Sequence, residues 1–296
     1  MNKIRVMLTG LSGQVGQSIL RNCSNNYHII ALSRNELDLS DQQQIIRVIS
    51  ELKPDIIINP AAYTNVEMAE DNKDEAYLVN VMAPKIMAKE ANKLCIPLVH
   101  FSTDYVFDGT KNEPYNESDK PNPINVYGNT KLEGEIAIQK NTKLFYIFRT
   151  SWVFSSLGKN FFTTMLKLLQ KKRELNVINN QFGSPTSSDL IAQKLFLFLD
   201  VALLKEKSKD LYGIYNLTSS GMTSWYDYAR KINKLLGKEN SADIYSVNSK
   251  SYVTKAKRPE MSVLDNTKLN DIIGEMDDFW EVVLQKEHKK IILNDN

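Results

Sequence analysis

The stretch KIRVMLTGLSGQVG, residues 3–16, decides the fold. A short apolar strand ends at about Leu8, glycines follow at positions 10, 13 and 16, and a helix begins next to the last of them. Glycines here permit a tight turn and let backbone N–H groups approach a pyrophosphate at a helix N-terminus. The stretch therefore predicts a dinucleotide-binding turn with Gly10, Gly13 and Gly16 against the cofactor.

A second strand, residues 28–32, ends at Ser33 and Arg34. An acidic residue at this point would bind a ribose 2′-hydroxyl, whereas a hydroxyl and a guanidinium suit a 2′-phosphate. Ser33 and Arg34 therefore favour NADPH as cofactor. Glu36 lies close by, so NADH remains an alternative.

Strand-like runs alternate with helical patterns through the first half of the chain. Strands are expected at residues 54–59, 96–102 and 144–149, with helices at about 42–52, 74–94 and 126–139. This alternation predicts an α/β fold, a Rossmann-type doubly wound parallel sheet. Ala61 and Ala62 follow the third strand, where small side chains let a cofactor lie close.

Beyond Thr150 the pattern loosens. Helices are expected at about residues 160–172, 188–204, 224–236 and 277–293, and strands at 175–178 and 213–217. We expect residues 1–150 to form the NAD(P)-binding domain and residues 151–296 a smaller substrate-binding lobe, partly interwoven with the first. The sequence contains no repeat and no low-complexity linker.

Composition excludes several classes of function. Lys and Arg number 37 against 35 Asp and Glu, so no basic surface for nucleic acid or membrane is expected. No apolar run reaches the ~20 residues of a membrane span. Two cysteines, Cys23 and Cys95, form no disulfide framework and fit a reducing cytoplasm. Three scattered histidines predict no metal site.

Tyr127 and Lys131 form the main candidate for chemistry. Their i, i+4 spacing puts both side chains on one face of a helix. A free phenol has a pKa near ~10. A neighbouring ammonium lowers that pKa, so we expect a proton-transfer pair for a carbonyl/alcohol couple.

The segment STDYVF, residues 102–107, begins at the end of the fourth strand. The hydroxyl of Ser102 or Thr103 is placed to hydrogen-bond a substrate carbonyl beside the Tyr127 phenol, which would stabilise charge developing on that oxygen. We expect Thr103, Tyr127 and Lys131 to act together.

These motifs resemble the extended short-chain dehydrogenase/reductase superfamily, and within it the dTDP-4-dehydrorhamnose reductase family. The resemblance spans nearly the whole chain. It rests on GLSGQVG (10–16), AAYTNVEMAE (61–70), STDYVFDG (102–109), NVYGNTKLEGE (125–135), FRTSWVF (148–154), QFGSPT (181–186) and RPEMSVLDNTKL (258–269). The last three segments are more specific than the superfamily motifs.

The resemblance implies NADPH-dependent reduction of the C4 keto group of dTDP-4-dehydro-L-rhamnose. Tyr127 would supply the proton, Lys131 would bind the nicotinamide ribose, and Thr103 would orient the carbonyl. Gln14 and Val15 would lie on the pyrophosphate, beside Ala61 and Ala62. The positions that would contact the sugar or nearby groups are Thr64, Val66, Ser102, Asp104, Tyr105 and Trp152, and Arg258 would suit the diphosphate.

Alternatives remain open. Dehydratases of this superfamily carry Thr-Asp-Glu, and Tyr105 in place of the second acid argues against dehydration. A reductase giving the 6-deoxy-L-talose epimer is not excluded, nor is a non-catalytic binding subunit like the regulatory subunit of methionine adenosyltransferase. A homodimer is left open. Gln17 and Ser18 replace the acidic residue that some family members use in a magnesium-assisted dimer, which argues against a metal bridge.

Overall fold

A six-stranded parallel sheet forms the centre of the molecule. The computed structural model describes residues 3–171, 174–204, 211–237 and 242–294. The strand order is β10-β5-β4-β3-β1-β2, and every neighbouring pair is parallel. The strands are β1 (Ile4–Leu8), β2 (Tyr27–Ala31), β3 (Ile56–Asn59), β4 (Leu98–Thr103), β5 (Phe145–Thr150) and β10 (Gly213–Asn216). The predicted parallel α/β fold is confirmed.

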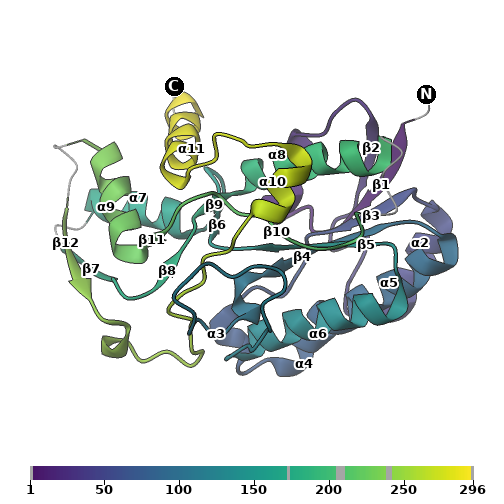
Figure 1. Cartoon of the computed structure of the whole chain (residues 1–296), viewed down its shortest axis with the longest axis horizontal. Helices are drawn as coiled ribbons and strands as arrows, with labels where there is room; N and C mark the ends of the chain where they lie inside the picture. The colour runs from purple at the N-terminus through teal and green to yellow at the C-terminus, as the bar shows by residue number, and fades with distance from the viewer. Residues whose placement is uncertain (1–2, 172–173, 205–210, 238–241, 295–296) are drawn as a thin grey trace.

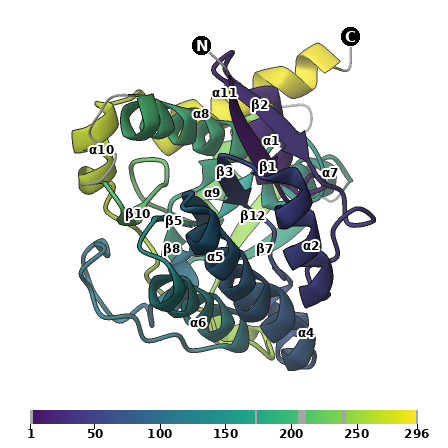
Figure 2. The same ribbon diagram turned by 90° about the vertical axis from the view of Figure 1, so that its right-hand side faces the viewer.

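Helices cover both faces of this sheet (Figures 1 and 2). One face carries α2 (Gln42–Leu52), α5 (Ala83–Leu94) and α6 (Val126–Asn141). The other carries α1 (Gln14–Arg21), α8 (Ser188–Leu199) and α10 (Thr267–Ile273). Figure 2 shows α8 on the opposite side of the sheet from α5 and α6.

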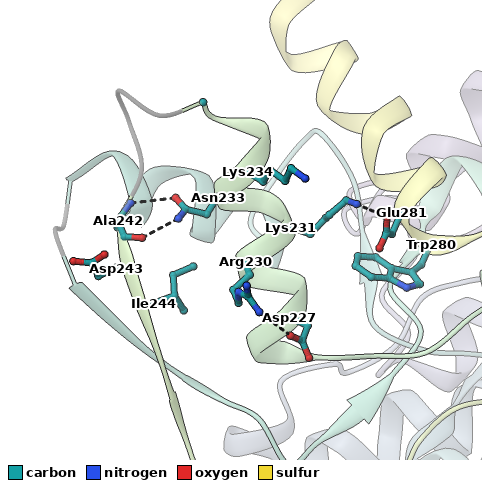
Figure 3. A pocket seen from close by; sticks show the side chains of 11 residues that line it. Asp227, Arg230, Lys231, Asn233, Lys234, Ala242, Asp243, Ile244, Trp280 and Glu281 are labelled. Carbon is teal, nitrogen blue, oxygen red and sulfur yellow. Dashed lines mark hydrogen bonds and ion pairs between the residues drawn. The ribbon is translucent and has the colours of Figure 1, made fainter.

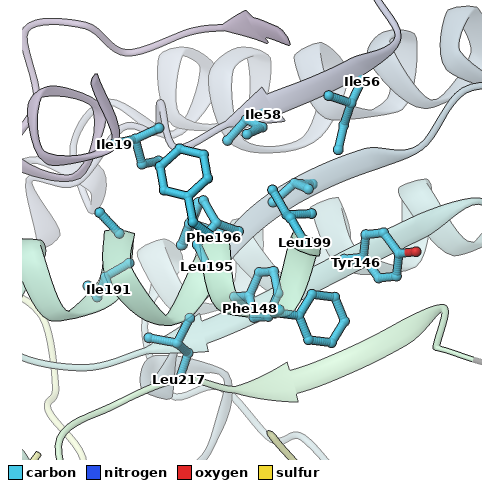
Figure 4. Close-up of a cluster of buried hydrophobic side chains, with 14 of the residues drawn as sticks. Ile19, Ile56, Ile58, Tyr146, Phe148, Ile191, Leu195, Phe196, Leu199 and Leu217 are labelled. Atoms are coloured by element: carbon cyan, nitrogen blue, oxygen red, sulfur yellow. The ribbon is translucent and has the colours of Figure 1, made fainter. Parts of the chain in front are cut away.

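Alternation along each strand assigns its side chains to the two layers. In β1, Val6 and Leu8 join the cluster under α1 and α8, while Met7 joins the cluster under α2 and α5. In β3, Ile56 and Ile58 join the cluster under α1 and α8. Successive strand residues point to opposite faces, so continuous apolar runs are expected of a sheet buried on both sides. Figure 4 shows the first cluster, in which Phe196 and Leu199 of α8 reach the strands.

The second half of the chain builds two regions. Strand β10 adds to β5 at the edge of the central sheet, and α8 packs on α1. The remaining elements form a separate cluster with its own core. They are β6 (Val153–Phe154), α7 (Phe161–Lys171), β7 (Glu174–Ile178), β8 (Phe182–Gly183), β9 (Thr186–Ser187), β11 (Thr223–Ser224), α9 (Trp225–Leu235), β12 (Asp243–Val247) and α11 (Trp280–Asn294). Residue 172, the expected end of α7, lies outside the described residues.

The helix expected over residues 74–94 is interrupted. The structure has α4 (Lys73–Tyr77), a π-helical turn η1 (Leu78–Met82) and then α5. Pro84 explains the interruption, because it has no N–H for the carbonyl four residues earlier, at Asn80, and its ring would clash with that carbonyl. A short helix, α3 (Val66–Ala69), precedes α4. No helix in the described part of the chain is long and apolar enough to cross a membrane.

A buried ion pair holds α6 to the sheet. Arg149 of β5 donates Nε to Glu135 Oε1 at 3.0 Å and Nη2 to Glu135 Oε2 at 2.7 Å. The two side chains are 2% and 0% exposed. The guanidinium also lies 5.1 Å from the centre of the Phe107 ring. This bidentate geometry satisfies both carboxylate oxygens in the buried interior.

Replacing Arg149 tests how much this ion pair stabilises the folded chain. In Arg149→Met the Glu135 carboxylate stays buried without its partner, and we expect a loss of about 3–5 kcal/mol in the free energy of unfolding. Urea denaturation of the variant and the parent measures it. The matched control is Arg230→Met, which breaks an exposed pair with Asp227 (62% and 56% exposed) and should cost about 0–1 kcal/mol. Equal losses in the two variants would contradict the expectation.

Candidate active site

The strand order reverses between β1 and β3, which is where doubly wound sheets bind their ligands. The glycine turn follows β1, and Ala61 follows β3. The two segments touch: a Cβ at Gly10 would lie 3.0 Å from the Ala61 nitrogen. A Cβ at Gly16 would lie 2.2 Å from the Gly10 carbonyl oxygen, so only glycine lets α1 begin this close to the turn. The turn therefore presents backbone rather than side chains at the switch point.

Helix α6 brings Tyr127 to the end of β4. The side chain of Asn125 caps the helix by accepting from the Gly128 N–H at 2.7 Å, which places Tyr127 in the first turn. Two glycines allow close approach on either side. A Cβ at Gly128 would lie 2.1 Å from the Tyr105 carbonyl oxygen, and one at Gly134 would lie 2.2 Å from that of Asn80.

The Tyr127 phenol sits among groups from the end of β4. Burial raises the pKa of Tyr127 to about 12, a hydrogen bond with the Thr103 side chain opposes this, and the Asp104 charge adds to it. The expected lowering of this pKa by Lys131 is therefore not found, because burial outweighs the stabilising contacts. Tyr105 packs edge-on against Tyr127, with ring centres 5.7 Å apart. A phenol with such a pKa keeps its proton at neutral pH and can act as a donor.

Lys131 is fully enclosed, with 1% of its surface exposed. Its Nζ donates to the Phe101 carbonyl at 2.6 Å and lies 3.1 Å from His100 Nε2. Burial lowers the pKa of Lys131 to about 8, while the Glu135 charge raises it. Lys131 thus remains mostly an ammonium at pH 7 and loses its proton about one pH unit higher.

The whole chain matches a known family. The sequence model described as the RmlD substrate binding domain matches residues 4–291. A dTDP-4-dehydrorhamnose reductase of Burkholderia thailandensis is 37% identical over 279 residues, covering 92% of this chain and 93% of that protein. The chain belongs to this family of reductases.

Solved structures of the same family superpose closely. The dTDP-4-dehydrorhamnose reductase of Clostridium acetobutylicum has a TM-score of 0.91 at 33% identity, covering 98% of this chain and all of that one. The enzyme of Bacillus anthracis, solved in complex with NADP, has a TM-score of 0.87 at 32% identity with the same coverage.

In this reductase-family chain, three residues that were predicted to contact the cofactor interact with other protein side chains. The Ser33 hydroxyl donates to Glu36 Oε2 at 2.6 Å, and Arg34 lies 3.8 Å from Glu75, with 80% of its side chain exposed. Gln14 Oε1 accepts hydrogen bonds from Ser155 at 3.0 Å and Asn160 at 2.9 Å. The exposed Arg34 is free to reorient at little cost, whereas Gln14 ties the glycine turn to the second half of the chain.

The second lobe meets α3 through charged residues. Arg258 Nη2 donates to Glu67 Oε1 at 2.6 Å and hydrogen-bonds the Tyr105 side chain. Lys255 pairs with Asp71 nearby. The structure thus brings Arg258 to Tyr105 and to the helix that begins at Val66, while Thr64 is exposed just before it.

Trp152 has an unusual conformation. Its φ is +46°, in the left-handed region. Its indole stacks on that of Trp225 with ring centres 3.4 Å apart and planes 2° apart. Gly183 lies against its edge, where a Cβ would come within 2.3 Å of the ring. Trp225 and Gly183 together hold Trp152 in this strained position.

Several buried polar atoms lie where β4 and β5 end. Among the described residues, Ser102 Oγ and Thr150 Oγ1 have no hydrogen-bond partner. Burial raises the pKa of Asp104 to about 7, against hydrogen bonds from Ser262 and Thr103 that lower it. Buried polar groups without protein partners mark a site that is completed by something else.

The sequence interpretation missed Asn80. This buried residue lies in η1, where its Oδ1 accepts from the Tyr63 N–H at 2.8 Å and its Nδ2 donates to Thr130 at 3.1 Å. It joins the segment after β3 to α6, directly behind Lys131. The sequence signal for this position was an asparagine four residues before Pro84, within a helical pattern.

A cavity in the second half of the chain lies outside this constellation. It measures about 560 Å³ and is lined by residues of α9, β12 and α11 (Figure 3). Two of its cations are paired with acids, Arg230 with Asp227 and Lys231 with Glu281. None of the predicted site residues lines it. In the part of the chain that the structure describes, no group of three or more His, Cys, Asp or Glu is placed to hold a metal ion.

Asp104 should make stability depend on pH. Its pKa in the folded chain lies near 7, above the ~3.9 of a free aspartate, so its stabilising contribution is full at low pH and disappears as pH rises from about 4 to about 7. In Asp104→Asn this loss is absent. Between pH 4 and pH 8, the free energy of unfolding of the variant should rise by roughly 2–4 kcal/mol relative to that of the parent.

Urea denaturation at several pH values measures this difference. The control is Asp277→Asn, since that side chain is 74% exposed. A difference between Asp104→Asn and parent that stays constant with pH would show that Asp104 is ionised throughout.

Proposed function

We propose that this chain reduces the C4 keto group of dTDP-4-dehydro-L-rhamnose to dTDP-L-rhamnose, with hydride from NADPH and a proton from Tyr127. The observation that carries the proposal is the group at the end of β4. There Tyr127 hydrogen-bonds Thr103, and Lys131 is buried one helical turn below. The assembly lies at the sheet edge that carries the glycine turn. The names of the relatives point to the same reaction.

The residues present fit a nicotinamide dinucleotide. Gly10 and Gly16 leave a turn that a Cβ would fill, and Ser102 and Thr150 keep buried hydroxyls unpaired. In the proposal the glycine turn, with Gly13, Gln14 and Val15, holds the pyrophosphate through backbone N–H groups. Ala61 and Ala62 line the dinucleotide, and Lys131 and Tyr127 hold the nicotinamide ribose. When bound, the cofactor supplies the hydride.

Preference for NADPH follows from the end of β2. Ser33 and the exposed Arg34 offer a hydroxyl and a guanidinium to a 2′-phosphate. A relative solved with NADP supports this choice. Glu36 accepts from Ser33 at 2.6 Å and is the group that would bind a bare 2′-hydroxyl, so NADH is the alternative.

Each catalytic residue has a separate task. Tyr127 keeps its proton at neutral pH because its pKa is raised to about 12, and it releases that proton to the C4 oxygen as negative charge builds there. Thr103 orients the carbonyl beside the phenol. Lys131 provides the positive charge that makes the departing proton less costly.

In the proposal residues 151–296 complete the substrate site. Arg258 and Tyr105, already hydrogen-bonded to each other, take the diphosphate and the sugar. Trp152, held by Trp225, contributes an aromatic wall. Thr64, Val66, Ser102 and Asp104 lie around the sugar. These assignments predict a substrate bound between α3 and the second lobe.

One assay tests the proposal. The purified chain is given NADPH and dTDP-4-dehydro-L-rhamnose, the loss of reduced-nicotinamide absorbance is followed, and the product is identified by NMR. Formation of dTDP-L-rhamnose supports the proposal. The 6-deoxy-L-talose epimer would keep the mechanism and change the product. Cofactor binding without turnover would favour another keto-sugar or a non-catalytic subunit.

Removing the phenol hydroxyl should abolish proton transfer. We expect Tyr127→Phe to lower kcat by about 10²–10⁴-fold, the usual contribution of a positioned acid. Its affinity for NADPH should change little, because the ring and its contact with Tyr105 remain. Steady-state rates and cofactor fluorescence titration measure the two effects. Retained turnover would show that another group supplies the proton.

The glycine turn offers a test of cofactor placement. In Gly16→Ala the new methyl would meet the Gly10 carbonyl at 2.2 Å, so the turn must shift. We expect NADPH affinity to fall by about tenfold or more, which corresponds to at least ~1.4 kcal/mol. Gly237→Ala is the control for a general loss of stability: no atom lies within 4 Å of its added Cβ, but its φ of +77° strains an alanine far from the turn. An unchanged affinity in Gly16→Ala would remove the turn from the binding site.

A further inference from the structure

A row of polar side chains crosses the sheet beneath α6. The same pattern recurs on three adjacent strands. Two positions after a buried apolar residue, and therefore on the same face of the sheet, the side chain is polar. These polar residues are Thr9, Asn59 and His100. Asn59 and His100 are paired in register, and all three are buried. A polar row on an otherwise apolar face is costly unless its members satisfy one another.

The row forms a continuous chain that ends at Lys131. Thr9 Oγ1 donates to Asn59 Oδ1 at 2.6 Å. Asn59 Nδ2 lies 3.1 Å from His100 Nδ1, and His100 Nε2 lies 3.1 Å from Lys131 Nζ. The catalytic lysine is thereby linked to Thr9, the residue directly before the glycine turn.

Proton positions along this chain are tied to the charge of the lysine. A Lys131 ammonium must donate to Nε2, so the imidazole proton lies on Nδ1 and faces the Asn59 carbonyl oxygen after an amide flip. A neutral Lys131 amine accepts from Nε2–H, Nδ1 accepts from Asn59 Nδ2, and Asn59 Oδ1 accepts from Thr9. The second arrangement matches the contacts found. In each charge state both imidazole nitrogens and both ends of the Asn59 amide keep a partner, which a single fixed acceptor at the place of His100 would not allow.

We propose that His100 is a positioning residue for Lys131: its neutral imidazole accepts from the lysine as an ammonium and donates to it as an amine, while Asn59 and Thr9 reverse their hydrogen bonds to match. The idea rests on the proposed function, in which Tyr127 gives up one proton per turnover and solvent must replace it. An adjacent lysine that alternates between two charge states can carry that proton without leaving a buried polar group unpaired.

The surroundings favour a neutral imidazole and a lysine that titrates. Burial, and then the Lys131 charge, hold the pKa of His100 well below its usual range. The other charge that acts on Lys131 is that of Glu135 on α6, which is paired with Arg149 of β5; Tyr127 lies one helical turn earlier on α6, and Asp104 acts on Tyr127. His100 and the Phe101 carbonyl lie within hydrogen-bond distance of Nζ, and of these two groups only the imidazole can both accept and donate.

Imidazole NMR tests the reversal without any substrate. The chain has only three histidines, so ¹⁵N-histidine labelling of the full-length protein gives a spectrum that His100→Gln assigns. We expect His100 to stay neutral and to exchange one neutral tautomer for the other with a midpoint near the Lys131 pKa of about 8. In Lys131→Met the exchange should vanish.

Two results would overturn the proposal. One is a His100 signal that charges near pH ~6.5 like a free imidazole, or that shows no tautomer change between pH 6 and 9. The other is the same pH dependence in Lys131→Met. Both readouts are independent of turnover, so a chain that fails to reduce the keto-sugar still tests the role of His100.

Kinetics separates positioning from simple structural support. His100→Phe keeps a ring but offers no acceptor, so the ammonium loses stabilisation. The basic limb of the kcat profile should move down by about one pH unit, with kcat falling about twofold at pH 7 and about tenfold at pH 9. His100→Gln, whose amide can flip to accept or donate, should restore most of both. A profile with unchanged midpoint in His100→Phe, or no rescue by glutamine, would assign His100 a packing role only.

Discussion

A buried ion pair, Glu135 with Arg149, fixes the middle of helix α6 on the sheet, and the two α6 residues of the proposed site depend on that attachment. Lys131 lies one turn before Glu135 and Tyr127 one turn before Lys131, so fixing Glu135 fixes the height of both. The pair also adjusts the chemistry, because the Glu135 carboxylate raises the pKa of Lys131 against its burial. The same ion pair therefore acts on both the position and the pKa of Lys131, the lysine of the proposed catalytic set.

Burial decides most of the electrostatics here. It raises the pKa of Tyr127 to about 12 and that of Asp104 to about 7, and it lowers that of Lys131 to about 8. Each pKa unit corresponds to about 1.4 kcal/mol between the two protonation states. The phenol is thus kept as a proton donor while the lysine is brought near neutrality, so the two groups of the proposed relay are shifted toward the states that the reaction needs.

The features of the fold and of the candidate site that could be predicted from the sequence are those that depend on local interactions. The glycine turn, the apolar strands and the i, i+4 pair are local patterns, and they gave the parallel α/β fold and the α6 residues. The second half was expected to be partly interwoven with the first, but the place of β10 beside β5 could not be predicted, because strand order is set by contacts between distant segments. The π-turn at Asn80 follows from Pro84 and could be predicted from the local sequence. The close packing that it allows, with Gly134 against the Asn80 carbonyl, is apparent only in the folded structure. The same holds for His100: a lone histidine in a strand has no evident role until its register with Asn59 is known.

The interweaving of the two halves has a mechanical consequence. Gln14, in the glycine turn, is held by Ser155 and Asn160, and Arg258 of the second lobe is held by Glu67 of α3. Each half thus supplies a side chain that fixes an element of the other. In the proposed function a substrate diphosphate would replace Glu67 as the partner of Arg258, so substrate affinity would be the difference between two charge-assisted contacts rather than the value of one. Because the Arg258 and Glu67 side chains are 26% and 36% exposed, this exchange would leave no buried charge unpaired.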